Sequence, residues 1–295
     1  MKEKTIYALG FFDGVHLGHQ ALLRECRRLA AQHGCKAAAV TFNAHPDALV
    51  FGKAPGLLST SEDRKQLLLT YGMDMVLELP FDRELMTTHW SSFLFQLVKS
   101  GAAGFVCGSD FRFGAGSGGT AKKLEAFCKK RQLPCVIVPE QTLDGERISS
   151  TRIRQALEQG DMRQVNRLLG HPYILTGTVV SGQQLGRTIG IPTANLQLPD
   201  ELLPPRFGVY ACKCFVDGTL YMAVTNVGTR PTVNGSGTTV EANLLDFSGD
   251  LYGKKMIVCF FEFLRPEQKF PSLEDLQREI QKNALQTRKF FEKSQ

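Results

Sequence analysis

At 295 residues the chain is long enough to bury a large core, and its length favours two domains over one. The composition is ordinary for a soluble globular protein, and no apolar run approaches the ~20 residues that cross a membrane. The formal net charge of +6 suits phosphate-rich partners, either nucleotides or nucleic acid. Composition therefore argues against a membrane-spanning class and leaves these two partner classes open.

The residues before the first expected strand lack the apolar region of a signal peptide, so we expect a cytoplasmic protein. The eight cysteines form no Cys-x-x-Cys pair, and reduced thiols are the expectation. Cys212 and Cys214 are separated by one residue and would share one face of a strand. Packing is a better interpretation of this pair than metal binding.

The stretch from Gly10 to His19 joins an expected strand, Lys4 to Leu9, to an expected helix, Gln20 to Ala30. A helix start offers free N–H groups and a positive dipole end to an anion, and glycine lets a ligand approach the backbone. His16 and His19 are three apart and can point into the same space. The alternative is a glycine-rich turn beside two structural histidines. The candidate phosphate-binding residues are Gly10, Phe12, Asp13, Gly14, His16, Gly18 and His19.

A second candidate anion site lies at Ile148 to Arg154, which opens a helix expected to end at Gln159. Hydroxyl caps, the helix dipole and a fork-shaped guanidinium converge there. In isolation the segment would be an ordinary cap with surface arginines. Its candidates are Ser149, Ser150, Thr151 and Arg154. The spellings His-x-Gly-His and Ile-Ser-Ser-Thr-x-x-Arg together resemble the two signatures of the adenylyl- and cytidylyltransferase superfamily.

The first half alternates between strands and helices, which predicts a doubly wound, mostly parallel sheet. The expected strands after the first are Cys35–Phe42, Met75–Leu79, Gly104–Gly108 and Cys135–Val138. The expected helices are Glu62–Tyr71, with Ser61 as its cap, Trp90–Lys99 and Ala121–Arg131. Pro46 is expected to stop regular structure after the second strand. His45 lies at the ligand-binding rim of the sheet, where a site role and a structural role are equally open.

The glycines from Gly114 to Gly119 satisfy Gly-x-Gly-x-x-Gly, and Glu140 lies about where a ribose-binding acid belongs. However, Asp110 to Phe113 separate these glycines from the preceding strand, so the tight first turn of a dinucleotide site is missing. A mobile loop that carries Phe111, Arg112 and Phe113 to a planar, phosphorylated ligand is the better interpretation.

After an expected short helix, Asp161–Leu169, Gly170 to Pro172 form the expected linker, giving domains 1–170 and 171–295. The second half is rich in β-formers separated by turn residues, which predicts a small antiparallel barrel with a terminal helix. The expected strands are Tyr173–Ser181, Gly208–Val216, Leu220–Val227, Thr238–Asp246 and Lys254–Leu264, and the helix is Ser272–Phe291.

The motif Gly190-Ile191-Pro192-Thr193-Ala194-Asn195 resembles the Gly-x-Pro-Thr-Ala-Asn signature of riboflavin kinases. The kinase-like segments that follow are Gly208–Ala211, Asn226–Val233 and Glu241–Phe247. In the first half, Thr41–Pro46 and Gly108–Gly114 look like flavin-side motifs of the same family. Nearly the whole chain therefore resembles the bacterial bifunctional riboflavin kinases/FAD synthetases. The resemblance implies phosphorylation of riboflavin to FMN by ATP, and then adenylylation of FMN to FAD with release of pyrophosphate.

The kinase half lacks a P-loop, so the glycine-rich segment from Ser181 to Gly190 is the available phosphate cradle. Its candidate ATP contacts are Gly186, Arg187, Gly190, Thr193 and Asn195. Thr193 and Asn195 also offer the hard oxygen ligands that suit Mg²⁺. The resemblance implies that Glu241 is the base, whereas the residues alone leave it equally well an exposed strand glutamate.

Adenylyl transfer needs no protein nucleophile, because the FMN phosphate attacks the α-phosphorus of ATP directly. The protein must align the two substrates and stabilise charge on the leaving pyrophosphate, for which His16, His19 and the Ser149 helix start carry suitable groups. The resemblance implies flavin contacts at Asn43, His45, Asp110, Phe111, Arg112, Phe113, Asn226 and Arg230.

Three residues depart from the family pattern. Asn243 replaces a usual His, Asn283 replaces a frequent Asp, and Ala44 replaces a common Pro. None removes a group that the chemistry needs. Expected partners are small molecules, without nucleic acid or membrane, and a weak homo-oligomer is left open. Two alternatives remain: one active domain beside a flavin-binding regulator, and a barrel that binds RNA.

Overall fold

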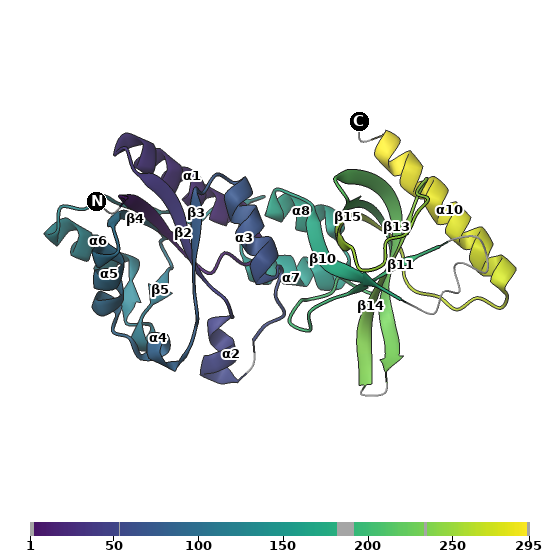
Figure 1. The fold of residues 1–295 in the computed structure, drawn as a ribbon, viewed down its shortest axis with the longest axis horizontal. Helices are drawn as coiled ribbons and strands as arrows, with labels where there is room; N and C mark the ends of the chain where they lie inside the picture. The colour runs from purple at the N-terminus through teal and green to yellow at the C-terminus, as the bar shows by residue number, and fades with distance from the viewer. Residues whose placement is uncertain (1–2, 53, 182–191, 233–234, 294–295) are drawn as a thin grey trace. The chain divides into compact units, whose positions relative to one another are not determined.

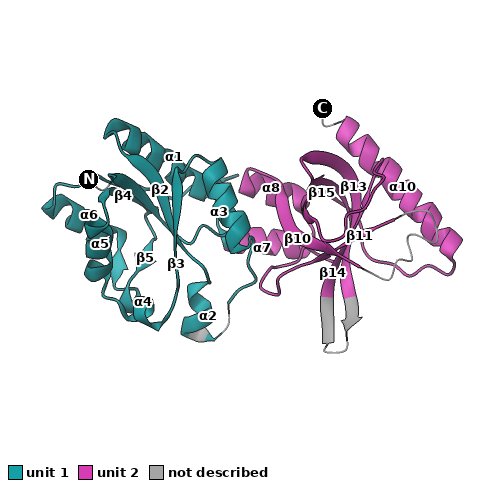
Figure 2. Ribbon diagram, viewed as in Figure 1, with its two compact units in different colours: residues 1–150 teal, residues 151–295 magenta. Residues whose placement is uncertain are grey.

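The computed structural model describes residues 3–52, 54–181, 192–232 and 235–293 (Figure 1). The chain forms two compact units, residues 1–150 and 151–295 (Figure 2). The boundary falls at the first residue of α7 (Ser150–Gln159), so the rest of α7 and α8 (Met162–Leu169) belong to the second unit. A functional boundary after residue 170 stays a prediction.

The first unit is built on a five-stranded parallel sheet in the order β3-β2-β1-β4-β7. The strands are β1 (Thr5–Leu9), β2 (Lys36–Phe42), β3 (Met75–Leu79), β4 (Ala102–Gly108) and β7 (Cys135–Val138). The main helices are α1 (Leu17–Gln32), α3 (Ser61–Thr70), α5 (Trp90–Lys99) and α6 (Ala121–Lys130). The predicted doubly wound sheet is confirmed.

Side chains alternate across β1 and divide the core into two layers. Ile6 and Ala8 pack with residues of α1 and α3, whereas Tyr7 and Leu9 pack with residues of α5 and α6 (Figure 1). Both faces of the sheet are therefore covered, which explains why the strands are almost continuously apolar.

The sheet has a topological switch point between β1 and β4. The chain passes from β1 outward to β2 and β3, and then returns to place β4 on the other side of β1. Loops that leave two such neighbouring strands diverge and open a crevice at their carboxyl ends. Gly10 and Gly108 lie at this edge, so the fold places the glycine-rich turn in the crevice.

Several local predictions need correction. Pro46 does not end regular structure but begins α2 (Pro46–Phe51), where a missing N–H costs nothing in the first helical turn. The cap of α3 is Thr60, whose side chain accepts from the Asp63 N–H, and Ser61 is already helical. Short elements were also missed, namely α4 (Arg83–Thr87) and the hairpins β5 (Arg112–Phe113)–β6 (Gly119–Thr120) and β8 (Thr142–Leu143)–β9 (Glu146–Arg147).

The second unit is a closed antiparallel barrel in the order β10-β11-β14-β13-β12-β15, closed by the β10–β15 pairing. The strands are β10 (Tyr173–Val180), β11 (Ala194–Gln197), β12 (Gly208–Val216), β13 (Thr219–Thr232), β14 (Gly235–Leu244) and β15 (Lys255–Arg265). The terminal helix α10 (Leu273–Glu292) packs on β12 and β13. Cys212 and Cys214 are fully buried, which confirms packing as their role. The predicted barrel and terminal helix are confirmed.

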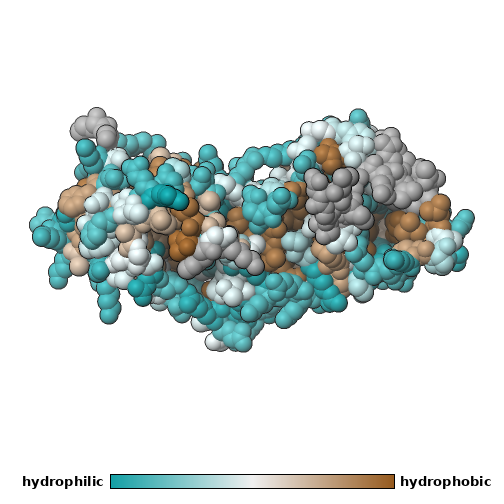
Figure 3. All heavy atoms as spheres, turned by 90° about the horizontal axis from the view of Figure 1, so that it is seen from below, coloured by the Kyte–Doolittle hydropathy of each residue, from teal (hydrophilic) through white to brown (hydrophobic). Residues whose placement is uncertain are grey.

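The molecular face in Figure 3 is largely hydrophilic, with apolar residues in small separate patches. Large exposed apolar side chains such as Leu49, Phe95 and Leu220 come from different elements. Within the described ranges, the helices are too short or too polar to cross a bilayer.

Candidate active sites

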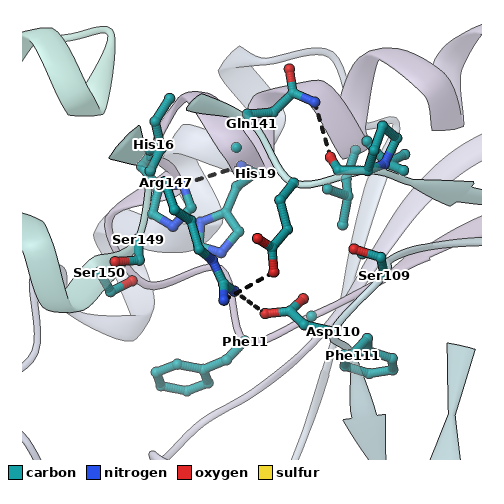
Figure 4. Close-up of a pocket in the computed structure, with 18 of the residues that line it drawn as sticks. Phe11, His16, His19, Ser109, Asp110, Phe111, Gln141, Arg147, Ser149 and Ser150 are labelled. Carbon is teal, nitrogen blue, oxygen red and sulfur yellow. Dashed lines mark hydrogen bonds and ion pairs between the residues drawn. The ribbon is translucent and has the colours of Figure 1, made fainter. Parts of the chain in front are cut away.

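A cavity of about 260 Å³ lies at the carboxyl ends of β1, β4 and β7 (Figure 4). It brings together two segments that are far apart in the sequence, the turn after β1 and the segment before α7. The sequence-predicted residues that line it are Gly10, His16, Gly18, His19, Asp110, Phe111, Ser149 and Ser150. The His-x-Gly-His motif, the Ile-Ser-Ser-Thr-x-x-Arg motif and part of a flavin-side motif thus contribute residues to one cavity.

The two histidines of this cavity lie against each other. His16 caps α1, and its Nδ1 accepts the His19 backbone N–H at 3.3 Å. Because Nδ1 is an acceptor, the neutral His16 ring carries its proton on Nε2, which can donate to a ligand. The His16 and His19 rings are stacked, with centroids 3.6 Å apart. A Cβ on Gly18 would lie 3.0 Å from the His16 ring, so glycine permits this packing.

Burial lowers the pKa of His19 well below 6.5, and neighbouring His16 and Arg64 lower it further. His19 is therefore neutral at pH 7 in the folded chain. The unfolded chain binds the proton more readily, so stability contributed by neutral His19 is complete above about pH 6.5 and is lost as the pH falls below it. We expect the first unit to need less urea to unfold at pH 5.5 than at pH 7.5, and His19→Gln to reduce this difference. An unchanged difference would contradict a neutral His19 in the folded chain.

Other residues of the glycine-rich turn shape the backbone and do not line the cavity. Phe12 is fully buried in a left-handed conformation with φ of 61°. The Oδ1 of Asp13, which is buried, accepts the backbone N–H groups of Leu58 and Ser59 at 2.9 and 3.2 Å. The N–H of Gly14 donates to the Ser59 hydroxyl at 3.0 Å. These bonds fix the turn against the segment before α3.

We expect Asp13→Ala to destabilise the first unit by about 2–4 kcal/mol, because two buried N–H donors would lose their acceptor. Asp47→Ala, which changes a half-exposed carboxylate in α2, is the control and should cost much less. Urea unfolding followed by circular dichroism measures both. Equal losses for the two variants would contradict the structural role of Asp13.

Arg64 is a buried cation that the sequence analysis missed. Its guanidinium is fully buried, lies 4.4 Å from the Phe11 ring centroid and donates to the Phe42 carbonyl. Within the described part of the chain, its Nε and Nη1 are buried without a hydrogen-bond partner. Arg64 lies four residues before the buried Leu68, and this helical spacing on an apolar face could have revealed it.

The remaining flavin candidates of the first unit occupy different environments. The Oδ1 of Asn43 accepts the Phe81 N–H at 3.0 Å, and His45 caps α2 with its ring 4.8 Å from Phe11. Arg112 is exposed in β5, whereas Phe113 is buried in the core and stacks on Phe111. Phe111 is the one of these three loop residues that lines the cavity, and it packs against the core cluster that holds Phe113.

The glycine loop itself packs against a helix. A Cβ on Gly114, whose φ is 71°, would lie 2.6 Å from the backbone of Trp90. Gly114 to Gly119 do not line the described cavity, so they form neither a dinucleotide turn nor a wall of this site. Thr151 and Arg154 lie in α7, in the second compact unit.

A second cavity, of about 360 Å³, lies between the barrel and α10 within the second unit. Its polar lining residues are Thr193, Asn226, Glu241, Asn243, Arg265, Glu267, Gln268 and Asn283. Apolar side chains from both elements, including Val209 and Ile280, complete the wall. The cavity therefore combines an apolar surface with convergent amides and carboxylates, as binding sites for planar ligands often do.

Strand register explains why Glu241 faces this cavity. Its neighbours Val240 and Ala242 are fully buried on the opposite face of β14. Asn226 of β13 and Asn195 of β11 are paired directly with Glu241 on its two sides. Opposed residues of antiparallel strands point to the same face, so the carboxylate lies between two amides. Asn195 does not line the cavity itself, whereas Thr193, two residues before it, does.

Four nucleotide and flavin candidates cannot be placed fully. Gly186, Arg187 and Gly190 lie outside the described residues. Arg230 belongs to β13, but its side chain is outside the described part of the structure.

Comparison with known proteins extends over both units. A family model for FAD synthetase matches residues 1–152, and one for riboflavin kinase matches residues 169–291. The chain is 35% identical to the bifunctional riboflavin kinase/FMN adenylyltransferase of Listeria monocytogenes, over 98% of this chain and 93% of that protein. The chain belongs to this bifunctional family. The chain is 38% identical to the Haemophilus influenzae member, over 96% of this chain and 93% of that protein. It is 36% identical to the Escherichia coli K12 member, over 98% of this chain and 94% of that protein.

The riboflavin kinase and FMN adenylyltransferase domains are therefore both present, in the order that the sequence predicted. Because each half matches an enzyme model, two activities are favoured over a single active domain or an RNA-binding barrel. A crystal structure described as a macrolide-efflux protein from Streptococcus pneumoniae is 31% identical, with a TM-score of 0.88, and covers 98% of this chain and 95% of that one. It provides a solved counterpart for the fold of this family member.

Two of the residues that depart from the family pattern form hydrogen bonds in the structure. The amide of Asn243 donates to the Pro192 carbonyl at 2.9 Å, so a hydrogen-bond donor remains where the family usually has His. Asn283 is buried and accepts from Arg265 Nε at 3.1 Å. Glu279 lies 3.4 Å from the same Arg265 and supplies the carboxylate that Asn283 lacks.

Proposed function

We propose that the cavity at the carboxyl ends of β1, β4 and β7 is the site of FMN adenylylation. The observation that carries this proposal is the convergence of His16, His19, Ser149 and Ser150 on that one cavity. These residues supply a helix start, a ring N–H and two hydroxyls, which are the groups that bind phosphate oxygens. The flavin would lie toward Phe111 and Asp110. His45, which packs on Phe11, and Asn43 would lie farther from the cavity.

In this site the protein aligns two phosphates and stabilises charge. The phosphate oxygen of FMN attacks the α-phosphorus of ATP, and the bond to the β-phosphate bridging oxygen breaks to release pyrophosphate. We propose that His16 Nε2–H and the α1 helix start stabilise the charge that moves to this leaving group. A neutral His19 stacked on His16 holds the ring in place. Ser149, Ser150, Thr151 and Arg154 would bind the remaining phosphate oxygens.

We propose that the cavity between the barrel and α10 binds riboflavin, and that Glu241 removes the proton from the hydroxyl that is phosphorylated. Asn195 and Asn226 are the strand neighbours of Glu241 and would help to orient its carboxylate, and Asn226 with Arg230 would contact the flavin. Gly186, Arg187 and Gly190 would hold the phosphates of ATP. Base catalysis and positioning of this kind account for the main demands of phosphoryl transfer to a hydroxyl.

We propose Mg²⁺ as the metal that accompanies ATP. The hydroxyl of Thr193 and the carboxamide of Asn195 are hard, neutral oxygen ligands, which fits an ion that keeps water and phosphate oxygens as its main ligands. Among the described residues, clusters of three or more His, Cys, Asp or Glu that could hold a metal are absent. Bound Mg²⁺ would neutralise phosphate charge.

The direct test is to incubate the full chain with riboflavin, ATP and Mg²⁺ and to separate the flavins by chromatography. FMN should appear first and FAD after it. Omitting Mg²⁺ should stop both steps. Absence of both products from a folded preparation would contradict the proposal. A cytoplasmic location and a weak homo-oligomer stay proposals, which fractionation and sedimentation would test.

A further inference from the structure

Arg147 is the one lysine or arginine that lines the described first cavity, and it faces two carboxylates, Asp110 and Glu140. The cavity wall thus has a formal charge of +1 − 2 = −1, with His19 neutral. A triphosphate is strongly anionic and is disfavoured by these two carboxylates. Moving Arg147 from the carboxylates to the phosphates would add to the compensation that the α1 helix start and Mg²⁺ supply.

The three charges come from three loops at the carboxyl edge of the sheet. Arg147 ends the β8–β9 hairpin, Asp110 follows β4, and Glu140 follows β7. One guanidinium nitrogen of Arg147 contacts Asp110, and another lies 3.0 Å from Glu140 Oε1 (Figure 4). Arg147 is thereby held across the cavity by two partners.

These ion pairs are easy to exchange. The side chains of Arg147, Asp110 and Glu140 are 49%, 55% and 46% exposed. Exposed pairs of this kind contribute little to stability, because water screens them. A guanidinium gains more from two parallel hydrogen bonds to phosphate oxygens in a closed site. Replacing carboxylate by phosphate is therefore favourable for Arg147.

The backbone near Arg147 can stay fixed while its side chain moves. The next residue, Ile148, is buried, and its N–H donates to the Gln141 carbonyl at 2.9 Å. Ser149 and Ser150, which line the same cavity, follow directly. The guanidinium thus starts beside the proposed phosphate-binding hydroxyls.

We propose that Arg147 is a phosphate-binding residue of the adenylyl transfer site, held by Asp110 and Glu140 until the nucleotide binds and then transferred to its phosphate oxygens. This inference rests on the proposed function of the first cavity. Glu140 is the holding partner in this exchange and binds no substrate.

The test compares Arg147→Gln, Arg147→Lys and Glu140→Gln in the full chain. Arg28→Gln is the matched control, because Arg28 also forms an exposed ion pair, with Glu25 on α1, but does not line the cavity. For each variant the KM for ATP and the kcat are measured in FMN adenylylation. Riboflavin phosphorylation by the same preparation reports whether the second unit is folded, and circular dichroism reports whether the whole chain keeps its wild-type secondary structure.

Arg147→Gln should raise the KM for ATP by about 10- to 100-fold, and Arg147→Lys should recover part of this loss, because lysine keeps the charge but not the fork. Glu140→Gln should change the KM in the opposite direction, since it releases Arg147 toward phosphate. A purely structural ion pair predicts the same direction for both changes. An Arg147→Gln KM within about twofold of Arg28→Gln, or a Glu140→Gln KM raised as in Arg147→Gln, would overturn the inference.

Binding of inorganic tripolyphosphate, measured by calorimetry, separates this inference from the proposed function. The wild type and Arg28→Gln should show a binding site that Arg147→Gln weakens. If that difference is found but the wild type makes no FAD from FMN, the phosphate site stands and the proposed reaction fails. If FAD forms and both binding and KM are unaffected in Arg147→Gln, Arg147 is not a phosphate ligand.

Discussion

Replacing Glu241 by glutamine should lower riboflavin phosphorylation by about 10²- to 10⁴-fold and leave the conversion of supplied FMN to FAD unchanged. Glutamine keeps the shape of the side chain beside Asn195 and Asn226, but it cannot accept the proton of the attacking hydroxyl. Rates measured separately with riboflavin and with FMN as substrate check this expectation.

Glu262→Gln is the matched control, because Glu262 is a barrel carboxylate on β15 that pairs with Arg163 and does not line the second cavity. It should keep both activities. Glu241→Gln with normal phosphorylation would show that Glu241 is a surface carboxylate. Loss of both activities in a folded Glu241→Gln chain would contradict two separate sites.

Replacing His16 by alanine should have the reverse effect, with FMN adenylylation reduced by about 10²- to 10³-fold and phosphorylation retained. The variant loses the ring nitrogen that we propose donates to the developing phosphate charge. Given riboflavin and ATP, the variant should therefore accumulate FMN, which chromatography of the flavins would reveal.

Alanine also removes the cap of α1, so a second variant is needed to separate catalysis from stability. His16→Asn retains a capping oxygen but lacks a ring nitrogen at the same distance, and it should accumulate FMN as alanine does. His33→Ala, at the other end of α1, is the control and should form FAD normally. Normal FAD formation by His16→Asn would contradict the role of the ring.

The sequence predicted those parts of the sites that depend on short local motifs. His16, His19, Ser149 and Ser150 stand at strand-to-helix or loop-to-helix junctions, and the alternation of elements was enough to bring the junctions to one edge of the sheet. The role of Glu241 was predicted from the family resemblance alone. Its neighbours Asn195 and Asn226 follow from strand register, and the pattern of a single strand does not determine register.

The features that were missed depend on contacts between distant segments. Arg147 pairs with Asp110 across 37 positions, and Arg64 is buried against the Phe11 side of the cavity. The sequence did not predict that Phe113 is a core residue, because β5 is only two residues long and is defined by its pairing with β6. The prediction that Pro46 ends regular structure was wrong, because proline can either end an element or begin a helix. The His45 cap distinguishes the two cases here.

The closed barrel also affects the reactivity of the kinase cysteines toward oxidants. Burial raises the pKa of Cys212, and it raises that of Cys259 to about 11, so these thiols remain protonated at neutral pH. Peroxides and disulfides react with the thiolate, which is scarce here. Riboflavin phosphorylation should therefore continue under oxidising conditions that inactivate enzymes with exposed, acidic thiols, so the formation of FMN would be protected from the redox chemistry that flavin cofactors serve.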